Sequence, residues 1–290
     1  MPRRNNLWGS LLLFVLIGCL LLWLPGCAKD PAKLKAAALT RAERLVVRGE
    51  YDGAILEYKN ALKADPRAAD VYYRLGQAYL KVAQYRDAFR QFERVVELTP
   101  SHEAAQLAIG GIYLKAGLFE DAQKIAKELL GLDPHDADAR LLLANAYAGK
   151  GLMSQAIAEL EGVSRDHPEL TAVHINLGVF YAATKRNELA EVELRRAMTL
   201  EPGSFDAWNY LGTSLFSLRR YEEALTPLRK AVALNPQLFD TLNLLAATLH
   251  DLGDDASALP ILERAHSLNP ADAGVTGALE KMRTAVKGKQ

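Results

Sequence analysis

Apolar and small residues recur along this chain with two periods, one of a helical turn and one of 34 residues. Between residues 35 and 272, seven successive segments share one pattern. In each segment, positions 4, 7, 8 and 11 lie on one helical face, and positions 20, 24 and 27 form a second stripe. The pattern therefore predicts two amphipathic helices in every segment, and seven helical hairpins in all.

Small residues occupy two of these positions throughout. Position 20 is always alanine: Ala54, Ala88, Ala122, Ala156, Ala190, Ala224 and Ala258. Position 8 is always glycine or alanine: Ala42, Gly76, Gly110, Ala144, Gly178, Gly212 and Ala246. Short side chains at both positions allow the two helix axes to approach closely.

Glycine and proline mark the predicted helix ends. Position 15, between the two stripes, is Gly49, Gly117, Gly151 or Gly253 in four segments. Glycine adopts the left-handed conformation that ends many helices, which predicts the hairpin turn at this position. Position 32 is always proline, which ends a helix because it lacks an N–H and disfavours the α conformation of the preceding residue. These prolines are Pro66, Pro100, Pro134, Pro168, Pro202, Pro236 and Pro270.

This constellation resembles the tetratricopeptide repeat, whose pattern runs Trp-x2-Leu-Gly-x2-Tyr and then Ala, Phe, Ala and Pro. The segments that match best contain Tyr72, Leu75, Gly76, Tyr79, Ala88, Phe92 and Pro100, and Trp208, Leu211 and Gly212. The resemblance implies an all-α, right-handed superhelical solenoid of seven tetratricopeptide (helix-turn-helix) repeats. We number these repeats 1 to 7, with the predicted bounds 35–68, 69–102, 103–136, 137–170, 171–204, 205–238 and 239–272.

Both ends of the array differ from its middle. Repeat 1 has Ala38 at position 4 and Arg41 at position 7, and this polarity suits a terminal repeat with one unpaired face. After repeat 7, three apolar residues share one face of a C-terminal capping helix predicted over 273–290: Val275, Leu279 and Met282.

The first 26 residues are ordered like an export signal. Arg3 and Arg4 precede an uncharged run from Leu7 to Leu24, and the polar sequence begins after Cys27. The segment resembles bacterial lipoprotein signals, which end in a cysteine that receives diacylglycerol. Leu24-Pro25-Gly26-Cys27 fits that motif, so the prediction is lipidation at Cys27, with residues 27–34 as a short tether.

Other interpretations of this segment stay open. Pro25 is unusual in such a motif, and Leu16-Ile17-Gly18-Cys19 is a better local match, although cleavage there would leave apolar residues at the mature end. As a helix, Leu7 to Leu24 would measure about 27 Å, so an uncleaved membrane anchor is also possible, as is plain secretion. Every alternative places the repeats outside the cytoplasm, and the lipoprotein interpretation predicts a cell-envelope location, anchored to a membrane on the extracytoplasmic side.

The family resemblance also implies a binding surface. In this family the first helix of each repeat lines a concave groove, with positions 2, 5, 6, 9, 12 and 13 directed into it. The candidate groove residues are Tyr73, Leu107, Leu141, Asn145, Ile175, Asn176, Asn209, Tyr210 and Asn243. Two interpretations stay open: the apolar residues either anchor a partner or pad neighbouring helices, and the asparagines either bind a partner's backbone or are solvated.

The sequence does not match the chaperone-binding members of the family. Chaperone-binding members hold a terminal carboxylate with lysine, arginine and asparagine, and of that set only the asparagines occur, as Asn145 and Asn176. Leu141, Asp206 and Tyr210 occupy the cationic positions, which argues against this clamp.

Composition and motifs limit the partners, cofactors and activities that we expect. The 35 basic and 35 acidic residues balance, so nothing indicates a nucleic-acid partner. Cys19 and Cys27 are the two cysteines, and the six histidines, which we interpret as mostly solvated, lack metal-ligand spacing. No phosphate-binding glycine loop or nucleophile motif remains outside the repeats, so we expect no cofactor, no metal and no enzymatic activity.

The sequence thus predicts a membrane-tethered protein-protein interaction scaffold of the bacterial cell envelope. It would bind partner segments in its groove and serve in the assembly of a secretion, pilus or outer-membrane complex. The alternative is a regulatory subunit that recruits or controls an envelope enzyme such as a peptidoglycan hydrolase or a glycosyltransferase. The partner's identity, the choice of membrane and the oligomeric state do not follow from these residues.

Overall fold

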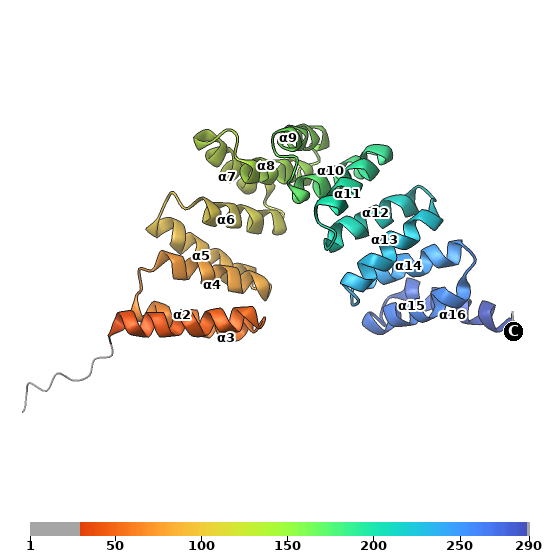
Figure 1. The fold of residues 1–290 in the computed structure, drawn as a ribbon, viewed down its shortest axis with the longest axis horizontal. Coiled ribbons are helices and arrows are strands. Elements are labelled where there is room, and N and C mark those ends of the chain that lie inside the picture. Colours follow the sequence, from red (N-terminus) through yellow and green to blue (C-terminus); the bar gives the residue numbers. More distant parts are fainter. Residues whose placement is uncertain (1–29, 289–290) are drawn as a thin grey trace, which may run out of the picture. The chain divides into compact units, whose positions relative to one another are not determined.

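The computed structural model describes residues 30–288, which form fifteen α-helices and no strand (Figure 1). The predicted all-α fold of consecutive helical hairpins is therefore confirmed. Residues 1–26, for which an export signal is predicted, and Cys27, the predicted lipidation site, lie outside the described residues.

Fourteen helices form seven hairpins, and one helix follows them. The first helices are α2 (Pro31–Val47), α4 (Ala69–Lys81), α6 (Glu103–Lys115), α8 (Ala137–Gly149), α10 (Thr171–Ala183), α12 (Phe205–Ser217) and α14 (Phe239–Asp251). The second helices are α3 (Tyr51–Ala64), α5 (Tyr85–Leu98), α7 (Phe119–Leu132), α9 (Met153–Asp166), α11 (Asn187–Leu200), α13 (Tyr221–Leu234) and α15 (Asp255–Leu268). The final helix is α16 (Ala273–Gly288).

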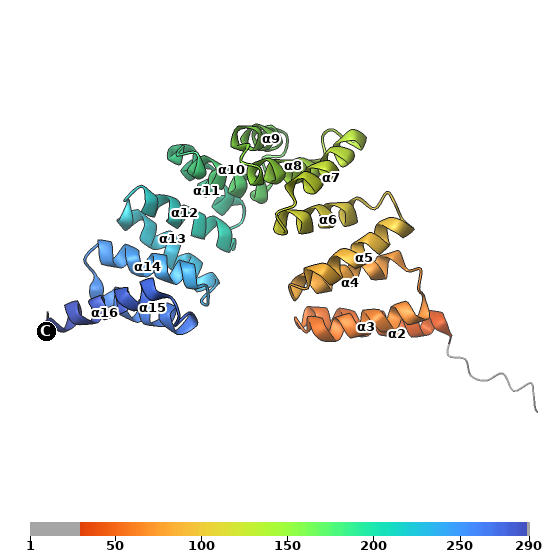
Figure 2. The ribbon, with the colours of Figure 1, turned by 180° about the vertical axis from the view of Figure 1, so that it is seen from behind.

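The chain divides into two compact parts, Met1–Ala105 and Gln106–Gln290, with the boundary near the start of α6. In the N-terminal part, α2 packs on α3 and α4 packs on α5. In the C-terminal part each hairpin from α8 onward packs on its successor, and α16 packs on α15. Figure 2 shows the same hairpins from behind.

The first helix starts earlier than predicted. Helix α2 begins at Pro31, so residues 31–34 of the predicted tether are helical. The cause is local: the Asp30 side chain accepts a hydrogen bond from the N–H of Ala32, and proline is favoured in the first helical turn.

The second helices form the most regular part of the core. The alanine at position 20 has an exposed fraction of 0% in all seven repeats. Positions 24 and 27 are also buried throughout. At position 8, Gly76 leaves room for the ring of Phe92, because a Cβ there would lie 2.7 Å from the ring's Cε1 atom. Gly178 and Gly212 make room in the same way for the position 24 leucines of their own hairpins, which confirms the predicted close approach.

Position 3 of the first helix belongs to the core as well, which the periodic pattern did not reveal. It is buried in repeats 2 to 7, as Val71, Ala105, Ala139, Val173, Ala207 and Thr241. This position lies one turn before position 7 on the same side of the helix. Most of its occupants are short, so hydrophobicity alone marks it weakly.

The turn inside each hairpin uses a left-handed residue at position 15. Gly49, Gly117, Gly151 and Gly253 have φ between 74° and 80°, as predicted. The other three repeats place Ala83, Lys185 and Arg219 there, with φ of 56°, 61° and 59°. The geometry of the hairpin therefore imposes this conformation even where the residue disfavours it.

Each second helix ends two residues before its position 32 proline, and the residue between them is extended. Asp65, for example, has φ −141° and ψ 91°. The predicted role of the prolines is confirmed.

Ionic contacts add to the links between hairpins. Arg220, at the turn of repeat 6, contacts Glu191 on α11 of repeat 5 and Glu223 on α13. Burial would raise the pKa of Glu191, but hydrogen bonds from Arg220 and Arg195 outweigh burial and hold that pKa below its usual value.

Position 15 offers a test of backbone strain. We expect Ala83→Gly to raise the free energy of unfolding by up to about 1 kcal/mol, and Gly117→Ala to lower it by about 1 kcal/mol, because only glycine adopts positive φ without strain. Thermal unfolding followed by circular dichroism measures both. Ala158→Gly on the exposed side of α9 is the control, and this same change inside a helix should destabilise by about 1 kcal/mol. A loss of stability in Ala83→Gly would contradict the interpretation.

Candidate protein-binding surface

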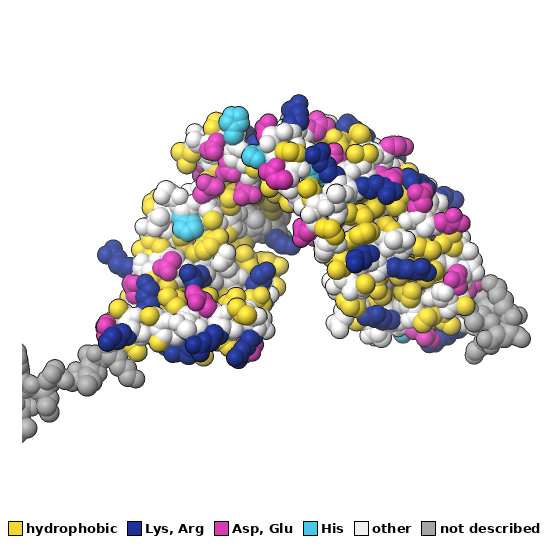
Figure 3. All heavy atoms as spheres, in the orientation of Figure 1, with side chains coloured by type: hydrophobic (Ala, Val, Ile, Leu, Met, Phe, Trp, Pro, Cys, Tyr) yellow, Lys and Arg dark blue, Asp and Glu magenta, His cyan; other side chains and the backbone are white. Residues whose placement is uncertain are grey.

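The nine candidate groove residues all lie on first helices, from α4 to α14. Eight of them are half-buried, and Tyr210 is exposed, with 38% of its surface accessible. On the face shown in Figure 3, hydrophobic and other uncharged side chains cover much of the surface over α12, α13 and α14.

Several apolar candidates contribute to packing. The ring of Tyr73 lies 5.6 Å from that of Phe92 and 4.8 Å from that of His102, measured between centroids. Leu107 and Leu141 contact buried clusters in the C-terminal part. Ile175 is half-buried on α10. Tyr73, Leu107 and Leu141 therefore contribute to packing, and all four side chains keep part of their surface exposed to solvent.

The asparagines do not form one row. Asn145 occupies position 9, Asn176 position 6, and Asn209 and Asn243 position 5. The side-chain oxygen of Asn209 accepts a hydrogen bond of 3.0 Å from the hydroxyl of Thr241 in the next repeat. Asn209 therefore links two first helices.

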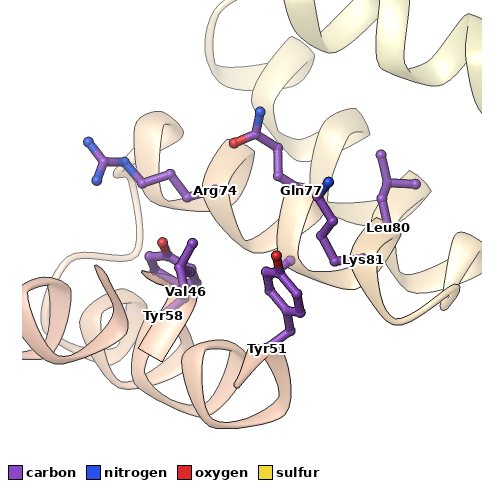
Figure 4. A pocket seen from close by; sticks show the side chains of 8 residues that line it. Val46, Tyr51, Tyr58, Arg74, Gln77, Leu80 and Lys81 are labelled. Atoms are coloured by element: carbon purple, nitrogen blue, oxygen red, sulfur yellow. The ribbon is translucent and has the colours of Figure 1, made fainter. Parts of the chain in front are cut away.

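A pocket of about 440 Å³ opens between repeats 1 and 2, within the N-terminal part (Figure 4). We call it the repeat 1–2 pocket. Its lining residues are Val46, Tyr51, Tyr58, Arg74, Gln77, Ala78, Leu80 and Lys81. Figure 4 shows the rings of Tyr51 and Tyr58 on one side and Gln77 and Lys81 of α4 on the other.

Polar contacts organise one end of this pocket. Tyr58 is 4% exposed, and burial raises the pKa of its hydroxyl even though the hydroxyl is hydrogen-bonded to Arg74. Arg74 also donates to Glu43 over 2.6 Å. Lys81 makes no ion pair with any residue in the described part of the chain.

A second pocket, of about 250 Å³, lies between repeats 5 and 6, and we call it the repeat 5–6 pocket. It is lined by Gly178, Val179, Ala182, Asn187, Leu194, Tyr210, Thr213, Ser214 and Ser217. No charged residue lines it. Thr213 and Ser217 donate their hydroxyl hydrogens to carbonyls of their own helix. Ser214 is 4% exposed, and its hydroxyl has no hydrogen-bond partner in the described structure.

The two pockets occupy equivalent places in the repeat. Each is lined by positions 12, 17 and 24 of one repeat and by positions 6, 9, 10 and 13 of the next. The repeat therefore forms a pocket at the same place twice: two cations, Arg74 and Lys81, line the first, whereas no charged residue lines the second.

Side chains pack into the corresponding places at other junctions. Between repeats 3 and 4, Leu142 packs over Gly110 and Phe119 packs over Gly149. Between repeats 4 and 5, position 10 is the buried Phe180. The same position is Ala78 in the repeat 1–2 pocket and Ser214 in the repeat 5–6 pocket. A small residue at position 10 does not mark a pocket by itself, because repeat 4 carries Ala146 there, at the junction where Leu142 and Phe119 pack against glycines.

The expectation that the histidines are mostly solvated is wrong for His174. Its exposed fraction is 0%, its Nδ1 atom lies 2.6 Å from the carboxylate of Glu193, and its Nε2 atom donates to the carbonyl of Pro168 over 3.0 Å. Tyr72 and Trp208, also at position 4, donate to the carbonyls of Pro66 and Pro202. A ring with a polar hydrogen at position 4 thus ties the first helix to the preceding junction.

Comparison with known proteins places these features in a family. Models of the tetratricopeptide repeat (TPR) match residues 42–82, 73–122, 114–175 and 205–238. The chain belongs to the tetratricopeptide repeat family. TPR proteins act as scaffolds for protein-protein interactions and are generally non-catalytic.

Solved structures support the same fold. A thermophilic TPR protein of Thermus thermophilus is 27% identical, with a TM-score of 0.58, and the match covers 63% of this chain and 100% of that one. A TPR protein of Parabacteroides merdae is 11% identical, with a TM-score of 0.63, over 87% of this chain and 99% of that one. A chain of the APC/C hetero-tetramer Cut9–Hcn1 is 21% identical, with a TM-score of 0.64, and the match covers 86% of this chain and 49% of that one.

A search of curated proteins finds no match. No helix within residues 30–288 combines the length and apolar character needed to cross a bilayer. In the same residues, no group of three or more histidine, cysteine or acidic side chains is placed to hold a metal ion.

The unpartnered hydroxyl in the repeat 5–6 pocket leads to a stability prediction. We expect Ser214→Ala to raise the free energy of unfolding by about 1 kcal/mol, because a buried hydroxyl without a partner carries an uncompensated desolvation cost. Thr248→Ala is the matched control, since Thr248 holds position 10 of repeat 7 and its hydroxyl donates to Leu244 over 2.7 Å. That variant should be destabilised. A loss of stability in Ser214→Ala, measured by chemical denaturation, would show that its hydroxyl has a partner in solution.

Proposed function

We propose that this TPR protein is a membrane-tethered scaffold of the bacterial cell envelope that binds segments of partner proteins along its first helices. The observation that carries the binding surface is the pair of equivalent pockets, because a hollow between neighbouring first helices can receive a side chain of a bound segment. The scaffold itself has no catalytic role in this proposal.

The N-terminal sequence supports the tether. Arg3 and Arg4, the apolar run and Cys27 follow the order of a lipoprotein signal. Only three residues separate Cys27 from the start of α2 at Pro31, a reach of about 10 Å if extended. A lipid on Cys27 would therefore hold repeat 1 against the membrane. Partners would lie close to the bilayer, which favours a role in assembling a secretion, pilus or outer-membrane complex.

Metabolic labelling tests the tether. In cells given a radiolabelled fatty acid, we expect the native chain and Cys19→Ser to carry label and Cys27→Ser to carry none, because Cys27 supplies the acceptor thiol. Gel autoradiography of the purified chain measures incorporation. Label that persists in Cys27→Ser would exclude Cys27 as the sole acceptor, and an unlabelled native chain would favour an uncleaved anchor or plain secretion.

Site-specific crosslinking tests the binding surface. A photoreactive benzoylphenylalanine in place of Tyr210, which is exposed on α12, should crosslink a partner in intact cells. The same group in place of Val192 is the control, because Val192 is 61% exposed on the second helix α11. Crosslinked products are identified by mass spectrometry. Products at position 192 without any at position 210 would contradict binding along the first helices.

A further inference from the structure

The repeat 1–2 pocket differs from its counterpart in repeats 5 and 6 in size and in charge. It measures about 440 Å³ against about 250 Å³, and Arg74 and Lys81 are both among its lining residues. Because the two pockets share one register, their lining side chains can be compared position by position. The chemistry of its occupant can therefore be inferred from those side chains.

The interior of the pocket is apolar. Val46, Ala78 and Leu80 contribute aliphatic surface, and Tyr51 and Tyr58 contribute their rings. The hydroxyl of Tyr58 is already hydrogen-bonded to Arg74, so this part of the wall offers water few partners. Apolar surface of this kind is stabilised when an apolar side chain covers it.

The rim supplies hydrogen-bond donors and one uncompensated positive charge. The charge of Arg74 is balanced by Glu43, with which it pairs over 2.6 Å. Lys81, in the last turn of α4, has no such partner among the described residues. The amide of Gln77 offers N–H donors beside it. An anion at this rim gains charge-assisted hydrogen bonds, whereas a cation would be repelled.

We propose that the repeat 1–2 pocket binds an apolar side chain of a partner protein's segment that carries a carboxylate next to it. The apolar group enters between Tyr51 and Tyr58, and the carboxylate accepts hydrogen bonds from Lys81 and Gln77. This inference rests on the proposed function, because it assigns the side-chain chemistry that one part of the binding surface selects. The occupant that this charge and apolar surface favour is an acidic, apolar segment of a partner protein.

Peptide selection on the purified full-length chain in non-ionic detergent tests the inference. A random dodecapeptide library on phage is selected on the native chain and on three variants in parallel. Lys81→Glu reverses the charge at the rim. Ala78→Phe fills the pocket with the residue that the chain carries at the same position as Phe180. Lys63→Glu, exposed on α3 outside the pocket, makes the same charge change as a control.

The native chain and Lys63→Glu should both enrich peptides with an apolar residue beside aspartate or glutamate. A synthetic peptide of that sequence should bind at least tenfold more weakly to Lys81→Glu and to Ala78→Phe, as measured by fluorescence anisotropy. Its affinity for the native chain should fall with added salt. Versions with a free or an amidated C-terminus distinguish a terminal carboxylate from an acidic side chain as the anion.

Three results would overturn the assignment. Peptides that bind all variants equally would show that the first helices bind segments outside this pocket, which leaves the proposed function intact. Selected sequences that match stretches of this chain would assign the pocket to a second copy. Failure to enrich any peptide, with crosslinking also absent at Tyr210, would overturn the assignment and the proposed function together.

Discussion

Close contact between the two helices of each hairpin is the constraint on which the rest of the structure depends. The alanine at position 20 is fully buried in every repeat, and in repeats 2, 5 and 6 a glycine at position 8 faces a large side chain at position 24. Alanine and glycine lose no side-chain entropy on burial, so in this contact that cost falls only on the large side chain at position 24. Because the same small residues recur, the backbone of each hairpin is repeated while the remaining positions vary.

Repetition of the backbone explains why pockets recur in one register. Once the helices are fixed, the space between neighbouring first helices depends on the volumes of a few side chains. Ala78 and Ser214 leave it open at position 10, and Phe180 occupies the corresponding place. A scaffold of this type can thus change the side chains it accepts at one junction without altering its neighbours. Specificity and fold depend on different positions of the same repeat.

The features predicted well from the sequence are those set by local backbone constraints. Proline at position 32 and glycine at position 15 act within their own turn, so their spacing located the helix ends. The alanines at position 20 predicted the close approach of the two helices equally well, because every repeat needs the same close contact.

Features that depend on contacts between residues far apart in the sequence could not be predicted in the same way. Asn209 is engaged by Thr241, which lies 32 residues away, and no local pattern indicates that bond. His174 is buried because Glu193 and the carbonyl of Pro168 satisfy its ring, whereas its residue type suggests exposure. The pockets exist where the side chains of two neighbouring repeats leave space unfilled, so they depend on both repeats together. Of the nine groove residues named from the sequence only Tyr210 lines either pocket, although positions 6, 9, 12 and 13, which the family resemblance directs into the groove, line both.

Helix α16 has a consequence for assembly. Val275, Leu279 and Met282 bury one face of this helix in the cluster that includes repeat 7. That face of α15 and its neighbours would otherwise remain apolar and would match the first helix of another hairpin. By covering it, α16 prevents the repeats of one molecule from continuing into those of another at this end. Stacking of another hairpin on repeat 7 would first require α16 to detach.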